Sequence, residues 1–152
     1  MTAKYLLIFL ISLVGSRDFD GAWRYAQAIA AVTADRELQA AALVVVWREN
    51  FGHETSYPPF GLTHYVATHP GVCLHRAGDG RRDRIGCVPL TIEDGAARAV
   101  SALRFIRDHR CSSRQWIDVF GRYGPTGRCE VTSWGTTQAV AMRRALAEWA
   151  GQ

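Results

Sequence analysis

Several patterns that would point directly to a function are missing from this chain. It has no internal repeat, no low-complexity run and no second domain, and its 152 residues, 48% hydrophobic and 21% charged, suit one globular domain. The apolar run at residues 5–15 is too short for an ordinary membrane-spanning helix. No Gly-x-Ser-x-Gly sequence is present, which excludes hydrolases that carry that nucleophile motif.

Metal-binding and nucleic-acid-binding patterns are incomplete. No cysteines have the Cys-x-x-Cys spacing of zinc sites, and His53-Glu54 lacks the second histidine of His-Glu-x-x-His because Tyr57 stands in its place. The net charge is +4, yet the dense basic cluster at residues 81–84 has no accompanying aromatic platform. We expect no metal, no organic cofactor and no nucleic acid, whereas an anionic cell-wall polymer agrees with the charge.

The N-terminus favours export. Residues 1–16 combine a short start that carries one lysine with the brief apolar run, as in a secretory signal peptide. An uncleaved anchor and a buried first helix are the alternatives. We therefore divide the chain into a signal peptide or anchor at 1–16 and one domain at 17–152, with no stable membrane span.

The four cysteines also favour a periplasmic or secreted protein. They permit three pairings, and the sequence does not choose among them. We favour the two nearest-neighbour pairs, Cys73 with Cys87 and Cys111 with Cys129. Each pair closes a short loop and would stabilise the fold by roughly 3 kcal/mol.

Most of the remaining chain has the periodicity of helices. The first expected helix is capped by Asp20 and runs to residue 32, and the second runs from near Asp35 to Glu49. The capping-box sequence of residues 91–94 opens the third helix. A short fourth helix starts at Ser112 or Ser113 and is ended by Gly121 and Gly124, and the last helix spans residues 136–149. Residues 50–90 are irregular, and Asp79-Gly80 can turn a small hairpin closed by Cys73 and Cys87.

Glu49 is the most informative residue. It ends an apolar helical run and shares a face with Leu38, Ala42 and Val45, at steps of four, three and four. Apolar surroundings and the negative end of the helix dipole both favour the protonated carboxyl. A carboxyl that stays protonated near neutral pH can act as a general acid, which is the chemistry that cleaves glycosidic bonds.

Other carboxylates are weaker candidates. Glu54 lies in a loop and is expected to face solvent or to order the turn. Asp79 and Asp83, in the proposed hairpin, are expected to form the turn and to pair with nearby arginines. A second catalytic acid is therefore not assigned.

Three segments, in order, resemble the lysozyme-like superfamily, especially bacterial lytic transglycosylases and flagellar-type N-acetylglucosaminidases. Residues 43–52 look like the helix that ends in the catalytic glutamate. Phe60-Gly61-Leu62-Thr63 is similar to the Gly-Leu-Met-Gln of transglycosylases and the Phe-Gly-Ile of glucosaminidases. Residues 122–125, Arg-Tyr-Gly-Pro, are similar to the Tyr-Asn-x-Gly segment that lines the cleft.

The resemblance implies a mainly α (α+β) fold, a helical bundle around a central buried helix with a small disulfide-closed β-hairpin lobe. It implies a groove for peptidoglycan glycan strands and Glu49 as the general acid. The residues it places in the groove are Phe60, Gly61, Leu62, Thr63, His64 and Tyr123. Separately, we expect a monomer.

The sequence departs from the family at three places. Asn50 stands where the family has Ser. Thr63 or His64 stands where transglycosylases carry Gln, and Gly124 replaces the Asn that follows the tyrosine in the family. We expect a peptidoglycan-cleaving glycosidase, with the transglycosylase route favoured over the muramidase or glucosaminidase route. The departures motivate an alternative, an inactive peptidoglycan-binding or structural protein of the envelope or of a phage.

Overall fold

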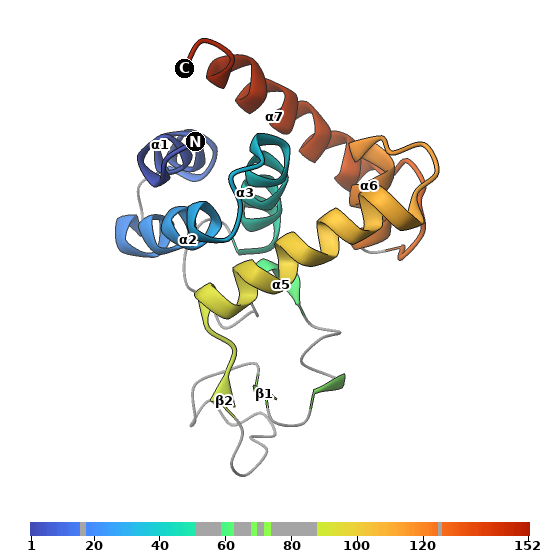
Figure 1. The fold of residues 1–152 in the computed structure, drawn as a ribbon, viewed down its shortest axis with the longest axis horizontal. Coiled ribbons are helices and arrows are strands. Elements are labelled where there is room, and N and C mark those ends of the chain that lie inside the picture. The colour runs from blue at the N-terminus through green and yellow to red at the C-terminus, as the bar shows by residue number, and fades with distance from the viewer. Residues whose placement is uncertain (16–17, 51–58, 63–67, 70–71, 74–87, 125) are drawn as a thin grey trace.

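The computed structural model describes residues 1–15, 18–50, 59–62, 68–69, 72–73, 88–124 and 126–152. Its α-helices are α1 (Ala3–Val14), α2 (Phe19–Val32), α3 (Arg36–Asn50), α5 (Ile92–Phe105), α6 (Trp116–Tyr123) and α7 (Ser133–Trp149). The shorter elements are the 3-10 turn η1 (Pro59–Gly61), the π-helical turn η2 (Ile106–Arg110) and the strands β1 (Val72–Cys73) and β2 (Val88–Pro89). The helices form one body, and the strands lie beyond α5 on the side away from α7 (Figure 1). The prediction of a mainly helical fold is confirmed.

Helix α3 is the centre of the body. Asp35 Oδ1 accepts hydrogen bonds from the backbone N–H groups of Glu37 (2.9 Å) and Leu38 (3.2 Å), which caps the helix where the sequence predicts its start. Every residue from 38 to 46 is buried. The helix contacts α1, α2, α5 and α7, and Figure 1 shows it between them. Its all-round apolar sequence agrees with this central position.

Helix α1 packs into the core. The ring of Phe9 meets the ring of Trp149 edge-on, with centroids 5.8 Å apart. The Met1 ammonium donates to Gln39 Oε1 (2.9 Å), and Gln39 Nε2 donates to the Met1 carbonyl oxygen (3.1 Å).

In the part of the chain that the structure describes, no helix combines the length and apolarity that a membrane span needs. The signal-peptide or anchor assignment of residues 1–16 stays a prediction, and cleavage there would uncover apolar surface on α2 and α3.

The cap of α2 differs from the prediction. Asp18, not Asp20, is the N-cap residue, and its Oδ1 accepts a hydrogen bond of 2.9 Å from the Gly21 N–H. Asp20 lies in the first turn, where a carboxylate is also favourable because of the helix dipole. The two aspartates are two residues apart, and the sequence pattern alone does not separate these positions.

The second half of the chain confirms two predictions. Thr91 Oγ1 accepts a hydrogen bond of 3.1 Å from the Asp94 N–H and so caps α5, as the capping-box sequence predicts. Cys111, directly after η2, forms a disulfide with Cys129, which precedes α7. This disulfide closes the segment that carries α6.

Helix α6 begins later than predicted. It starts at Trp116, because Ser113 uses its hydroxyl oxygen to accept a hydrogen bond of 3.1 Å from the Gln115 N–H and belongs to the preceding turn. Gly121 lies inside the helix and does not end it, whereas Gly124 does. The correction leaves Tyr123 as the last helical residue.

The predicted hairpin lobe is not confirmed. Strands β1 and β2 pair in parallel, with Val72 opposite Val88, whereas the two arms of a hairpin run antiparallel. The predicted turn at residues 79–80 lies outside the described residues. So does Cys87, and with it the predicted Cys73–Cys87 disulfide.

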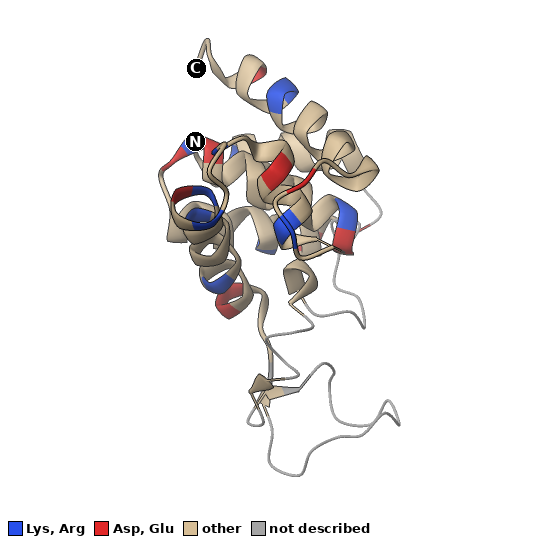
Figure 2. Ribbon diagram, turned by 90° about the vertical axis from the view of Figure 1, so that its right-hand side faces the viewer, with Lys and Arg blue, Asp and Glu red and all other residues tan. Residues whose placement is uncertain are grey.

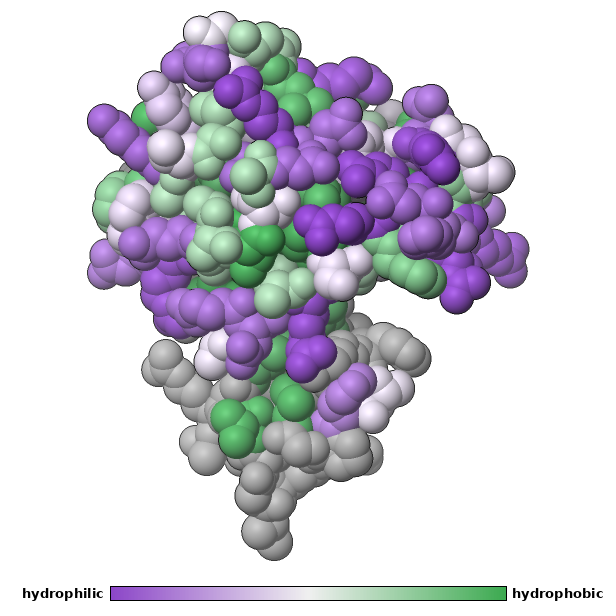
Figure 3. All heavy atoms as spheres, viewed as in Figure 1, coloured by the Kyte–Doolittle hydropathy of each residue, from purple (hydrophilic) through white to green (hydrophobic). Residues whose placement is uncertain are grey.

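Charged residues of both signs are distributed over the helices (Figure 2). Arg107 lies within 3.6 Å of carboxylate oxygens of Asp35, Glu37 and Asp108, so part of the positive charge is offset locally. On the face shown in Figure 3, polar and apolar residues alternate over the helical body. This mixed surface resembles that of most globular proteins.

Candidate active site

Glu49 is the penultimate residue of α3, and its side chain is half-buried. Burial raises the pKa of its carboxyl above the usual range, and the neighbouring Arg48 opposes that rise. Burial is the larger of the two effects. The direction of this pKa shift is the one predicted from the apolar helical stripe.

Gly61 lies directly against the carboxyl of Glu49. A Cβ atom at Gly61 would lie 2.6 Å from Glu49 Cδ and 2.8 Å from Oε2, too close for any side chain without displacement of the carboxyl. The backbone adds a second restriction, since Gly61 has φ +66° and Phe60 has φ 59°. Two consecutive residues are therefore in the left-handed region, where glycine is strongly preferred.

Two side chains hold the peptide groups of Phe60. Asn50, which is completely buried, accepts a hydrogen bond of 2.8 Å at Oδ1 from the Phe60 N–H. The Tyr123 hydroxyl donates a hydrogen bond of 2.6 Å to the Phe60 carbonyl oxygen. The end of α3 and the end of α6 thus fix the turn that places Gly61 beside Glu49. Both contacts satisfy backbone groups that would otherwise be buried without a partner.

Tyr123 also experiences the charge of Glu49. Burial raises the pKa of the Tyr123 hydroxyl far above its usual range, and the negative charge of Glu49 raises it further. The hydroxyl therefore stays protonated and remains a hydrogen-bond donor. Its hydrogen bond to Phe60, the neighbour of Gly61, places Tyr123 close to Glu49.

The predicted role of the Phe60 side chain requires a correction. Its ring is 0% exposed and packs edge-on against Tyr25, with centroids 5.3 Å apart. A Cβ on Gly95 of α5 would approach Phe60 Cδ2 to 3.3 Å, so the ring is enclosed by α2 and α5. Phe60 is predicted as a substrate contact, but its ring belongs to the core and it contributes to the site through its backbone.

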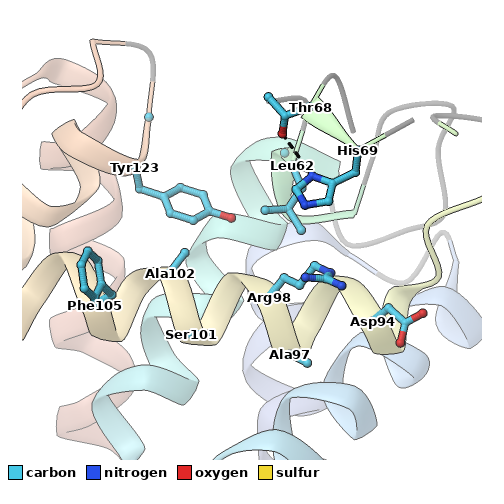
Figure 4. Close-up of a pocket in the computed structure, with 12 residues that line it drawn as sticks. Leu62, Thr68, His69, Asp94, Ala97, Arg98, Ser101, Ala102, Phe105 and Tyr123 are labelled. Atoms are coloured by element: carbon cyan, nitrogen blue, oxygen red, sulfur yellow. Dashed lines mark hydrogen bonds between the residues drawn. The ribbon is translucent and has the colours of Figure 1, made fainter. Parts of the chain in front are cut away.

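An open groove of ≈1030 Å³ extends from Gly61 and Tyr123 along α5 (Figure 4). Helix α5 contributes one wall, made of Asp94, Ala97, Arg98, Ser101, Ala102 and Phe105. The opposite wall is made of Gly61, Leu62, Thr68, His69, Tyr123 and Gly124. Glu49 does not line this groove itself, but it adjoins the groove where it contacts Gly61. Three of the predicted groove residues, Gly61, Leu62 and Tyr123, are brought together here.

A second pocket of ≈500 Å³ lies between α1, α3 and α7, with Trp47 and Val140 in its lining. None of the described residues that line it is a carboxylate, histidine or cysteine. The described lining of this pocket therefore offers no carboxylate or imidazole for acid–base chemistry. The groove beside Glu49 is therefore the candidate active site.

The remaining predicted site residues, Thr63 and His64, and the rival carboxylates, Glu54, Asp79 and Asp83, lie outside the described residues. Within residues that are described, no group of three or more His, Cys, Asp or Glu side chains is placed to hold a metal ion. The described part of the site offers the Glu49 carboxyl, whose pKa is raised, beside an open groove whose lining includes the Asp94 carboxylate and the His69 imidazole.

The wall on α5 is absent from the sequence-based prediction. Its residues occupy positions that the hydrophobic pattern assigns to the solvent-facing side of the helix. In the sequence, the sign of this wall is Phe105, a large aromatic residue on the polar face of the helix. In the structure its side chain is 48% exposed. A single exposed aromatic residue is common on protein surfaces, so the sequence alone does not mark this wall as a binding surface.

No family model matches the chain, and neither the curated proteins nor the solved structures contain a match.

Proposed function

We propose that the protein is a peptidoglycan-cleaving glycosidase with a lysozyme-like fold, in which Glu49 is the general acid/base. The bond cleaved is the one between N-acetylmuramic acid and N-acetylglucosamine. The observation that carries the proposal is the position of the Glu49 carboxyl. It is half-buried at a helix end, has a raised pKa, and lies against the left-handed Gly61 at the end of an open groove.

In the proposed reaction, Glu49 donates its proton to the glycosidic oxygen as the bond to the anomeric carbon breaks. The carboxylate that remains then accepts the proton of the muramoyl 6-hydroxyl, whose oxygen bonds to the anomeric carbon and closes an anhydro sugar. A raised pKa supports the first step because it keeps the Glu49 carboxyl protonated to a higher pH. Activity should fall as pH rises through the pKa of Glu49.

A hydrolase would use a second carboxylate to position water or to form a covalent intermediate. Asp94 is the one carboxylate among the described lining residues of the groove, and it lies in the first turn of α5. In Figure 4 it stands at the opposite end of the groove from Tyr123. We favour the transglycosylase route, in which one carboxyl serves both steps, because the sequence assigns no second catalytic carboxylate.

The proposal includes a periplasmic or secreted location and a monomer. The Cys111–Cys129 disulfide supports an oxidising compartment. The positive net charge of +4 suits the carboxylates of a cell-wall polymer.

Mass spectrometry of the products from purified cell walls tests the reaction. Anhydro-muramoyl ends are the expected result, and reducing ends would assign a hydrolase. Wall binding without any released fragment would instead favour the inactive binding protein that the substitutions at Asn50, Thr63 and Gly124 suggest.

A further inference from the structure

The wall that α5 contributes to the groove is a continuous strip of one helix face. Its residues recur at steps of three and four from position 94 to position 105, and these steps place them in line. At 1.5 Å per residue, the strip is about 16 Å long. Ala97, Ser101 and Ala102 form its middle and are small, so an extended ligand can approach the helix closely.

The charge of the strip comes from two residues, Arg98 and Asp94, among the described lining residues. Arg98 is exposed, and in Figure 4 its side chain rises from α5 on the side where His69 and Leu62 form the opposite wall. A guanidinium has five donors in a planar fork, so it can keep a partner in the protein and still bind both oxygens of a ligand carboxylate. Arg98 is thus placed to bind an anionic group on a ligand in the groove.

The far end of the strip combines an apolar ring with a cation. Phe105 is 48% exposed, and the guanidinium carbon of Arg110 lies 5.1 Å from the centre of its ring. The apolar face of a sugar can stack on such a ring. Arg98 within the groove and Arg110 at its end therefore each offer a cation to a glycan that carries negative charge, while Asp94 offsets part of the charge of Arg98.

We propose that Arg98 is a specificity-determining residue that binds a carboxylate carried by the glycan, so that the groove distinguishes carboxylate-bearing strands from neutral ones. This inference rests on the proposed function, because it takes the ligand of the groove to be a glycan. The carboxylate can come from the lactyl group of a strand without peptides or from a peptide attached to that group. Arg98 recognises the chemistry that the two sources share.

Equilibrium binding to soluble glycan strands tests the proposal. All proteins carry Glu49→Gln, so the strands are not cut during the measurement. The ligands are strands with their peptides, strands freed of peptides by an amidase, and each of these after chemical reduction of the carboxylates to alcohols. Arg98→Ala is compared with Arg98→Lys and with Arg104→Ala, an exposed arginine of α5 outside the groove lining.

Arg98→Ala should weaken binding to carboxylate-bearing strands by about tenfold or more and leave binding to reduced strands unchanged. Arg98→Lys should recover part of the loss, and Arg104→Ala should bind as the parent does. Loss with the peptide-free strands assigns the lactyl carboxylate, and loss confined to the peptide-bearing strands assigns the peptide. Equal effects of Arg98→Ala on reduced and unreduced strands, or no effect on either, would overturn the proposal. Failure of the proposed function is seen separately, as wild-type protein that releases no fragments from walls.

Discussion

Asn50 Oδ1 accepts a hydrogen bond of 2.8 Å from the Phe60 N–H, so the residue beside the candidate acid fixes the turn against which that acid lies. The family that we propose for this chain has Ser at this position. Here the longer asparagine side chain has a clear structural use, because it is completely buried and reaches across to η1. The substitution is therefore compatible with an ordered site.

Asn50→Ala should lower the free energy of unfolding by about 1–3 kcal/mol, since it leaves the Phe60 N–H buried without its acceptor. Urea denaturation measures the loss. Gln27→Ala, which removes an exposed amide from α2, is the matched control and should change stability by less than about 0.5 kcal/mol. Equal effects of the two substitutions would show that the Asn50 contact does not stabilise the turn.

Gly61→Ala should lose both stability and activity. The left-handed backbone costs about 1–2 kcal/mol for a residue with a Cβ, and that Cβ would displace the Glu49 carboxyl. Gly127→Ala is a close control, because Gly127 has φ +64° but open space around it. It should lose similar stability in a thermal melt and keep full activity on cell walls. Retained activity in Gly61→Ala would argue against the Gly61–Glu49 contact as part of the site.

The raised pKa of Glu49 predicts a pH-dependent effect of Glu49→Gln on stability. The folded state binds the proton more tightly than the unfolded state, so the contribution of Glu49 to stability is present below its unfolded pKa and is lost as pH rises through the folded pKa. Glutamine cannot ionise. The stability of Glu49→Gln relative to wild type should therefore increase as pH rises from about 4 through the folded pKa of Glu49.

Thermal melts across this pH range measure the difference. Glu148→Gln, which removes an exposed carboxylate from α7, is the matched control. A Glu49→Gln difference that is independent of pH, or that falls as pH rises, would contradict a raised pKa.

Phe9→Ala tests whether α1 belongs to the mature protein. Phe9 is 1% exposed and packs on Trp149, so its truncation should cost about 3–5 kcal/mol. Ile8→Ala, on the same helix at 57% exposure, should cost less than about 0.5 kcal/mol. The measurement is urea denaturation of protein recovered after export, together with its intact mass. Identical stability of both variants and wild type, with a mass that lacks residues 1–16, would show that the segment is a cleaved signal.

The sequence predicts the helical framework because the hydrophobic period and the caps are local signals. The stripe of α3 and the Thr91 cap of α5 depend on residues a few positions apart, and both are confirmed. The apolar N-terminal run is different. It favours a signal peptide in the sequence, with a buried helix as the alternative, and packing against α2 and α3 is a tertiary property.

The site is only partly predictable for the same reason. The helical pattern identifies Glu49, but the contact between Asn50 and Phe60 depends on where a distant turn returns to the helix. The buried ring of Phe60 likewise reflects packing on Tyr25, thirty-five positions away in the sequence. The groove along α5 forms from residues that look solvent-facing until the opposite wall is placed.

The most direct test of the account is fragment release from purified cell walls by wild type, Glu49→Gln and Glu148→Gln. Glu148 is an exposed glutamate whose contact with Arg144, at 3.5 Å, is a surface pair of small energetic weight. Wild type and Glu148→Gln should release fragments at equal rates, and Glu49→Gln should be slower by at least about a hundredfold while remaining folded. Release by folded Glu49→Gln at the wild-type rate would contradict the assignment of Glu49 as the general acid.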